Sequence, residues 1–475
     1  MPTLPIPLFS RSFKNADGTV LTDDAFVQYN GYIDALSGLH IRPGEVLAKN
    51  TALRNDGLFY WPDKDLIVCV DDGVTQLRTS SGETLVDYGP VGAVTFAPGN
   101  IVSFAYNSTA VFMAGGGRIN YINDTGLVTE MADADAPTTV THVAFLDGYI
   151  LAINNDGKFY WSDVNSATSW SALSFASAEA NPDKTQALHV TQRQIYILGT
   201  VSTEIWENDG VTPFSRIPGG LIELGCIAKY SVIKRGDSLM WLSHMRQFVE
   251  FTGTKVKFVS TRYADVIANF AVVSDCVGNL IMKDGQEFNV FHFPTEQRTL
   301  AYNPALDDWS EWGRWDETGM VWLPYDIRNS VYDIDSGKTF IGKGDAEVIA
   351  CLASDSRMDL TGAATSSPFK FLRQTGFIDH GTSKKKRLEQ LRFRAKRGGV
   401  WTEAVTPKLM FRYRNNGSSQ WSNIKEISLG SVGQTEIQVK MFRLGIYESR
   451  QYEISATDDV PIVLSNAEVD VTVLR

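Results

Sequence analysis

The chain has few cysteines and histidines, and neither kind is clustered. The four cysteines lie far apart and form no CxxC pair, which argues against a disulfide framework and fits synthesis in a reducing compartment. The six histidines have no histidine neighbour at i+2 or i+4, so we expect no metal site and no cofactor. These residues are Cys69, Cys226, Cys276 and Cys351, and His40, His142, His189, His244, His292 and His380.

Long hydrophobic runs are also missing. No apolar run approaches the roughly 18 residues that a membrane-spanning helix needs, so we expect no membrane insertion. The first residues, MPTLPIPLFSRSF, lack the basic segment and apolar core of a signal peptide. The net charge of −11 argues against attraction of the whole molecule to DNA or to an anionic membrane.

What the chain does have is a repeated hairpin. Each copy is a short apolar strand, a turn that carries Gly, Asn, Asp or Ser, and a second strand. The copies read LIVCVDDGVTQL (66–77), VFMAGGGRINYI (111–122), YILAINNDGKFYW (149–161), IYILGTVSTEIW (195–206), LMWLSHMRQFVEF (239–251), LIMKDGQEFNVFHF (280–293) and a weaker VYDIDSGKTFIG (331–342).

The spacing of the copies predicts the architecture. The aromatic residues Tyr121, Trp161, Trp206, Phe251 and Phe291 follow one another at intervals of 40, 45, 45 and 40 residues. Hairpins at this period are typical of the four-stranded blades of a β-propeller, in which stacked sheets bury both faces and a closed ring hides the edges. The copies indicate about seven blades, with six or eight still possible. A pair of β-sandwiches is the alternative, although sandwiches rarely keep so even a period.

A different pattern follows the repeat. Between 385 and 415, apolar residues such as Leu391, Phe393 and Phe411 alternate with basic ones, which is typical of half-exposed antiparallel strands. Several more short strands follow, so we expect a sandwich. The prediction is thus an all-β protein with an N-terminal arm (1–45), a β-propeller (46–365) and a C-terminal β-sandwich (366–475).

Propellers also host glycosidases, so catalytic groups need consideration. Glycoside hydrolysis requires two carboxylates about 5–9.5 Å apart. Glu179 and Glu204 are candidates because they lie in polar segments next to aromatic residues, although turn or capping hydrogen bonds explain them more simply. The segment 162–170 loosely resembles the Asp-box turn of sialidases but lacks its glycine and its spacing. No GxSxG sequence marks a nucleophilic serine, and we expect no catalytic residues.

The basic stretch is more informative. Between 384 and 414, 11 Lys or Arg residues and two acidic residues give a net charge of +9, which leaves −20 for the rest of the chain. Nucleic-acid phosphates or an acidic partner protein could meet such a face, or it could simply be solvated. The aromatic residues alternate away from the charges, which favours a protein partner. The expected interface residues are Lys384, Lys385, Lys386, Arg387, Arg392, Arg394, Lys396, Arg397, Arg412 and Arg414.

An ordered series of short segments resembles a known family. The series includes FYWSD (159–163), WSALSFASAEANPD (170–183), GTVSTEIWENDG (199–210), PFSRIPGG (213–220), ELGC (223–226) and MWL (240–242), and SGLHIRPG (37–44) precedes it. It is similar to the packaged-DNA stabilisation proteins of short-tailed bacteriophages, also called tail accessory factors or nozzle proteins.

The resemblance implies a structural role. Members form a hexameric ring of propeller subunits under the portal and its adaptor ring, extend the DNA conduit, retain the packaged genome and carry the tail needle or plug and the fibres or tailspikes. It implies a virion tail protein that assembles in the cytoplasm of the host bacterium, with genomic DNA passing through the lumen without sequence-specific binding. We expect Arg392, Arg394 and Arg412 to lie away from that lumen. The alternative is a carbohydrate-active propeller, either a tail-associated depolymerase or a lectin.

Overall fold

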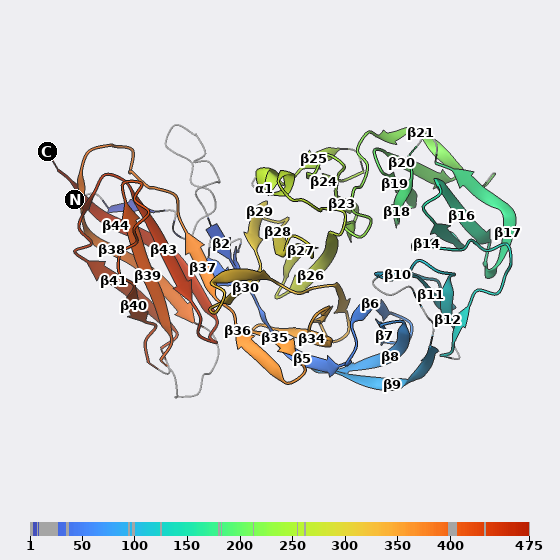
Figure 1. Cartoon of the computed structure of the whole chain (residues 1–475), viewed down its shortest axis with the longest axis horizontal. Helices are drawn as coiled ribbons and strands as arrows, with labels where there is room; N and C mark the ends of the chain where they lie inside the picture. The colour runs from blue at the N-terminus through green and yellow to red at the C-terminus, as the bar shows by residue number, and fades with distance from the viewer. Residues whose placement is uncertain are drawn as a thin grey trace.

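A computed structural model of the chain shows a ring of β-sheets joined to a β-sandwich (Figure 1). The structure describes all residues except 1–2, 7, 9–26, 35–37, 94–95, 97–99, 124–125, 179–180, 182, 212, 254, 261–262, 398–405, 432–433 and 475. Among the described residues, the single α-helix is the short α1 (Ala264–Ala268). No helix in this part of the chain is long and apolar enough to cross a bilayer.

Six separate four-stranded antiparallel sheets form blades of the ring. Five follow the chain order: β6 (Asn55–Trp61), β7 (Leu66–Asp71), β8 (Val74–Ser81), β9 (Thr84–Ala93); β10 (Ser103–Tyr106), β11 (Ala110–Ala114), β12 (Asn120–Asn123), β13 (Val128–Glu130); β14 (His142–Leu146), β15 (Tyr149–Ile153), β16 (Lys158–Asp163), β17 (Ser166–Ser177); β18 (Thr185–Thr191), β19 (Gln194–Gly199), β20 (Thr203–Asn208), β21 (Phe214–Ile222); and β22 (Ile233–Arg235), β23 (Ser238–Leu242), β24 (Phe248–Phe251), β25 (Val256–Phe258). The sixth combines β32 (Asn329–Asp333), β33 (Lys338–Gly342) and β34 (Val348–Ala353) with β5 (Gly44–Asn50) from the beginning of the chain.

The remaining position in the ring is filled by strands that are not a separate blade. They are β26 (Val277–Lys283), β27 (Gln286–Phe293), β28 (Arg298–Asn303) and β29 (Asp308–Glu311). Through one parallel pair, Tyr29 with Glu311, they continue as a nine-stranded sheet into the sandwich. The propeller prediction is confirmed, and its blade count is corrected: six blades are self-contained, and the hairpin repeat at 280–293 belongs to a sheet that continues into the sandwich.

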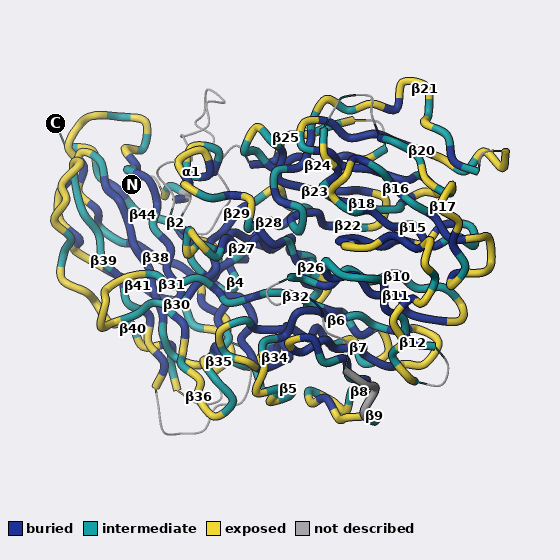
Figure 2. The backbone as a smooth tube through the Cα atoms, turned by 45° about the vertical axis from the view of Figure 1, so that its right-hand side comes forward, coloured by how far each residue is buried: buried dark blue, intermediate teal, exposed yellow. Residues whose placement is uncertain are grey.

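The repeated apolar runs are buried central strands. Every residue of β7, β11, β23 and β34 is buried, because a central strand has a neighbouring sheet on each face. Apolar clusters accordingly lie between successive sheets around the ring. Figure 2 shows the same arrangement, with buried strands inside and exposed loops at the rim.

The even period of aromatic residues breaks at one position. Tyr121, Trp161, Trp206 and Phe251 all lie on the third strand of their blades, whereas Phe291 lies on a second strand, β27. The segment around α1 lengthens the chain between β25 and β26. The last interval of 40 residues therefore joins positions that are not equivalent.

The first and last parts of the repeat region close the ring. Strand β5 pairs antiparallel with β34, in a register that runs from Gly44 opposite Ala353 to Asn50 opposite Val348. A buried cluster that includes Ala48, Phe340 and Ile349 joins this sheet to the β6–β9 sheet. Ring closure removes two exposed sheet edges that would otherwise pair with other chains.

The sandwich consists of the far half of the nine-stranded sheet and a second, seven-stranded sheet. Its apolar core lies between them and includes Leu391, Phe393, Leu409 and Phe411, so the prediction of a C-terminal sandwich agrees with the structure. The nine-stranded sheet contributes β2 (Val27–Tyr29), β37 (Phe371–Gln374), β43 (Arg450–Ala456), β39 (Lys408–Asn415) and β40 (Lys425–Ser428). The other contains β1 (Thr3–Pro5), β3 (Gly31–Ile33), β4 (Leu39–Ile41), β44 (Ile462–Val473), β38 (Lys386–Arg397), β41 (Glu436–Phe442) and β42 (Ile446–Tyr447). Two hairpins, β30 (Gly313–Asp316) with β31 (Val321–Pro324) and β35 (Met358–Gly362) with β36 (Thr365–Pro368), lie beside the junction.

The close approach at the start of β5 gives a test of ring closure. A Cβ added at Gly44 would lie 2.6 Å from the Ser356 carbonyl oxygen and 2.7 Å from the Met358 nitrogen, both backbone atoms. We therefore expect Gly44→Ala to lower the free energy of unfolding by about 1–3 kcal/mol in urea titrations. Gly117→Ala is the matched control, because nothing lies within 4 Å of the Cβ position there. Equal stability of the two variants would contradict the closure described.

Candidate functional site

The ten basic residues of the predicted interface do not form one face. Arg392, Arg394 and Lys396 alternate on β38 with buried apolar residues, and Arg412 and Arg414 do the same on β39. The two strands belong to different sheets whose apolar sides share one core. The charged side chains therefore point outward from opposite sides of the sandwich.

Much of this positive charge is balanced within the sandwich. Arg392 pairs with Glu468 at 2.8 Å and with Asp470 at 3.1 Å. Arg412 forms a two-bonded pair with Glu453, at 2.6 and 2.8 Å. Both sets of partners lie on adjacent strands of the same sheet, so these contacts hold strands together.

The other basic residues vary in exposure. Lys384, Lys385 and Lys396 are exposed. Arg387 and Arg394 form half-exposed or exposed pairs with Glu389 and Glu436. Lys386 is buried and donates to backbone carbonyl groups, including that of Lys384, and Arg397 donates to those of Leu429 and Gly430. Arg414 lies over the Trp421 ring, 4.7 Å from its centroid.

The carboxylates of the candidate catalytic segments that the structure describes form hydrogen bonds within their own blades. Glu204 is buried on β20 and accepts a hydrogen bond of 2.9 Å from the Trp206 indole N–H. Asp163, in the Asp-box-like segment, accepts one of 2.6 Å from the Ser169 hydroxyl across the β16–β17 turn. Glu179 lies outside the described residues.

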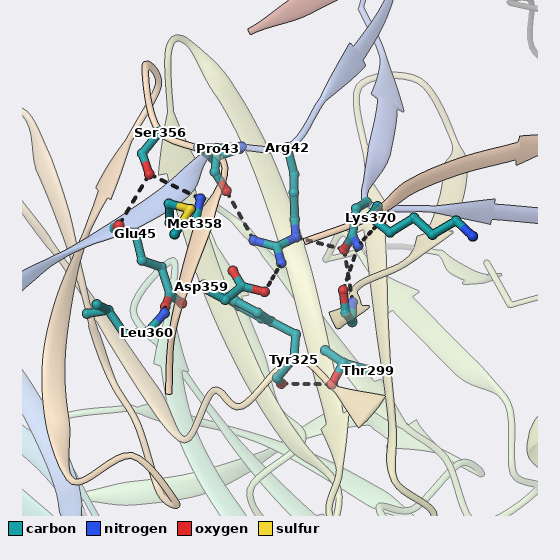
Figure 3. A network of polar contacts seen from close by, with 12 residues as sticks. Arg42, Pro43, Glu45, Thr299, Tyr325, Ser356, Met358, Asp359, Leu360 and Lys370 are labelled. Carbon is teal, nitrogen blue, oxygen red and sulfur yellow. Dashed lines mark hydrogen bonds and ion pairs between the residues drawn. The ribbon is translucent and has the colours of Figure 1, made fainter. Parts of the chain in front are cut away.

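A buried polar network joins the ring to the sandwich (Figure 3). The guanidinium of Arg42, between β4 and β5, donates to the Asp359 carboxylate at 2.6 Å and to the Asn30 side-chain oxygen at 2.8 Å. The Asn30 amide donates in turn to the carbonyl oxygens of Gly313 and Lys370. The Arg42 side chain is fully buried, so these contacts replace the water that it has lost.

A second buried ion pair lies beside Arg42. The Glu45 carboxylate on β5 accepts two hydrogen bonds from the Lys343 ammonium, at 2.7 and 2.8 Å, and one of 2.8 Å from the Leu360 backbone N–H. Both side chains are almost inaccessible, with exposed fractions of 0% and 2%. Burial raises the pKa of Glu45, and the Lys343 ammonium opposes that rise.

Two histidines from different blades meet on the ring axis. The rings of His142 on β14 and His189 on β18 lie 6.3 Å apart between centroids. Burial lowers the pKa of His142 to about 3, and the positive charges of His189 and Lys229 add to this effect. Burial likewise lowers the pKa of His189 to about 4, with Lys234 as the second cause. Within the described residues, no three His, Cys, Asp or Glu side chains are grouped to hold a metal ion.

Comparison with known protein families shows which family the chain belongs to. A family described as Bacteriophage P22 Gp10, β-propeller, matches residues 78–357, which is more than half of the sequence. The chain belongs to this family. The family resemblance seen in the sequence is confirmed, and the match covers most of the ring of this phage propeller protein.

Other comparisons add less. No curated protein sequence matches the chain. Similar solved structures include an extracellular domain of a one component system from B. thetaiotaomicron, with a TM-score of 0.43, 12% identity, and coverage of 77% of this chain and 44% of that one. The WD40 propeller domain of Doa1 has a TM-score of 0.42 and 10% identity, over 66% of this chain and 96% of that chain. The Neurospora crassa Pan2 WD40 domain has a TM-score of 0.43 and 10% identity, over 66% and 94%.

The sequence alone did not predict the buried polar network at the junction of this phage propeller, or the contact between His142 and His189. Arg42 and Asp359 are 317 residues apart, and no local pattern connects them. The histidine pair did leave a signal, since His142 and His189 are 47 positions apart, which is close to one blade period. A regular ring brings such positions on neighbouring inner strands together.

The Glu45–Lys343 pair gives a prediction for this junction. Lys343→Met leaves the buried Glu45 carboxylate without its cation, so we expect a loss of about 3–5 kcal/mol in the free energy of unfolding. Lys338→Met is the matched control on the same blade, because Lys338 and Glu83 are 3.4 Å apart and exposed by 29% and 42%. Its loss should stay within about 1 kcal/mol. Urea unfolding followed by tryptophan fluorescence measures both, and losses of equal size would refute the role given to the buried pair.

The histidine pair gives a pH prediction. The unfolded chain binds protons at these residues below about pH 6.5, whereas the folded protein resists doing so until about pH 3–4. The free energy of unfolding should therefore fall as the pH drops from 7 to 5. His142→Gln keeps a donor for the Lys229 carbonyl oxygen and should reduce this fall by about 2 kcal/mol. An unchanged pH dependence in urea titrations would contradict the burial described for His142.

Proposed function

We propose that the protein is a subunit of the tail nozzle of a short-tailed phage. In this role, six copies form a ring below the portal and its adaptor, extend the DNA conduit, retain packaged DNA and carry the tail needle or plug and the fibres or tailspikes. The family match over residues 78–357 carries the proposal, because it places the ring of sheets among phage propellers. The ring would be added to the virion during assembly in the host cytoplasm.

The charge distribution supports a conduit. Residues 366–475 contain 18 Lys or Arg and 11 Asp or Glu, which gives the sandwich a net charge of +7. Since the whole chain has a net charge of −11, the arm and propeller together carry −18. Each basic contact with a phosphate would add affinity and slow the passage of DNA. An acidic propeller near the lumen repels the phosphates, and DNA passes without sequence-specific binding.

The sandwich is the candidate surface for a neighbouring ring. Lys384, Lys385 and Lys396 are exposed, and their charges can meet an acidic protein surface. Arg392 and Arg412 are already paired with carboxylates of the sandwich, so they contribute less free charge to such a contact. In this proposal the positive domain faces the partner ring and stays away from the lumen.

The role needs no catalytic step. Glu204, the described member of the two glutamate candidates, is used in a hydrogen bond within its own blade. The working parts in this proposal are the shape of the ring and the surfaces that it presents. A non-enzymatic structural protein therefore fits the geometry better than the carbohydrate-active alternative.

Assembly of phage particles without the protein tests the proposal. We expect heads that package DNA and then lose it, because the conduit below the portal is left unfinished. Complementation with the wild-type chain should restore DNA retention, measured by nuclease protection of the genome. Stable, full particles that fail only to adsorb, or release of sugars from host polysaccharide by the purified protein, would instead support the depolymerase or lectin.

A further inference from the structure

The axis of the propeller contains a cavity that the nozzle role does not use. Its volume is about 660 Å³, and it is lined by the inner strands β6, β10, β14, β18, β22, β26 and β32 or by residues beside them. The charged residues of the lining are Lys229, Lys234 and Arg328. None of its described lining residues is Asp or Glu, although the chain as a whole has a net charge of −11.

The basic groups form a row along one wall. His142 lies against Lys229, with 3.2 Å between its Nε2 and the Lys229 carbonyl oxygen, and His189 lies beside His142. Lys229 and Lys234 lower the pKa values of His142 and His189 respectively, which places each lysine within electrostatic range of one ring. Two lysines and two histidines, which burial keeps neutral near pH 7, thus lie on or beside the successive inner strands β14, β18 and β22.

The two lysines of this row have no counter-ion in the part of the chain that the structure describes, whereas Arg328, elsewhere in the lining, has one. Arg328 is balanced by the Asp56 carboxylate, at 3.0 Å, and Tyr60 in the lining donates to Asp65. No carboxylate among the described residues pairs with Lys229 or Lys234. The Lys229 ammonium instead lies 4.7 Å from the centroid of the Tyr230 ring, and burial lowers its pKa. Like charges without a counter-ion are costly unless an anion enters.

An unpartnered donor also lies in this lining. Asn279, on β26, is 5% exposed, and its side-chain Nδ2 has no hydrogen-bond partner among the described residues. Buried amide groups are nearly always satisfied, so a donor of this kind indicates a missing acceptor. A multi-oxygen anion supplies several acceptors at once.

We propose that the axial cavity is an oxyanion site that takes the phosphate group of a small molecule. A phosphate group carries about −1.5 to −2 charges and three acceptor oxygens. It can therefore accept from two lysine ammonium groups and the Asn279 amide at once, which a single carboxylate does less well. The cavity is much larger than a phosphate ion. Phe59, Phe104 and Tyr230 provide apolar wall for the rest of the molecule.

Calorimetric titration of the full chain with inorganic phosphate and with pyrophosphate, in chloride buffer of constant ionic strength, tests this site. We expect saturable binding at one site, tighter for pyrophosphate. The double variant K229Q/K234Q should weaken it by at least about tenfold, since it removes both unpaired ammonium groups. K234Q alone, at an exposed position, should weaken it severalfold and guards against misfolding of the double variant.

The control variant is K384Q/K385Q, which removes the same charge from an exposed segment of the sandwich. Its phosphate affinity should stay within about twofold of wild type, because distant exposed charges are screened by salt. Absence of saturable binding, or equal weakening by the cavity and control variants, would overturn the proposal. Succinate that binds as tightly as pyrophosphate would also overturn it, because the cavity would then accept carboxylates such as those of an acidic peptide.

Discussion

The pairing of β5 with β34 closes the ring of blades. It joins residues about 300 positions apart in the chain and completes the last blade, so every other blade acquires a neighbour on both sides. The apolar central strands explain why closure is needed. A strand buried on both faces in the ring would expose an apolar face if the ring were open, as well as an unpaired edge.

The same N-terminal segment also positions the sandwich. Strands β2, β3 and β4, just before β5, pair within the two sandwich sheets, and β2 links the ring to the sandwich sheet through Glu311. The network around Arg42 fills the space where these parts meet. Buried ion pairs often contribute little net stability compared with apolar residues of similar size. Here Glu45 meets Lys343 in only one register of β5, so we interpret the pair as a device that selects this register.

The sequence predicts the repeating part of the fold well because the information there is local. An apolar run, a turn and a second strand recur within each blade, and burial on both faces demands runs such as those of β7 and β11. The prediction of blade positions is poorer where it used only the spacing between aromatic residues. Phe291 kept the interval without keeping the strand position, and the hairpin repeat at 280–293 turned out to belong to a shared sheet.

Long-range arrangements could not be predicted from one sequence. The alternation on β38 and β39 correctly separated apolar from basic residues, but nothing local shows that these strands lie in opposite sheets, so one expected face became two. The carboxylates that balance Arg392 and Arg412 lie 41–78 residues further along the chain. The pairing of β5 is likewise invisible in its own seven residues, which read as an ordinary strand.

In the proposed function the protein works through its shape, as a closed propeller that assembles into a larger ring. Electron cryo-microscopy of the assembled oligomer, reconstructed without imposed symmetry, can show whether it does. We expect a six-fold ring of propellers around an open hole wide enough for duplex DNA, with the acidic propellers nearer the hole than the basic sandwiches. Single copies without a ring, or a ring whose hole is lined by Arg392, Arg394 and Arg412, would contradict the proposed function.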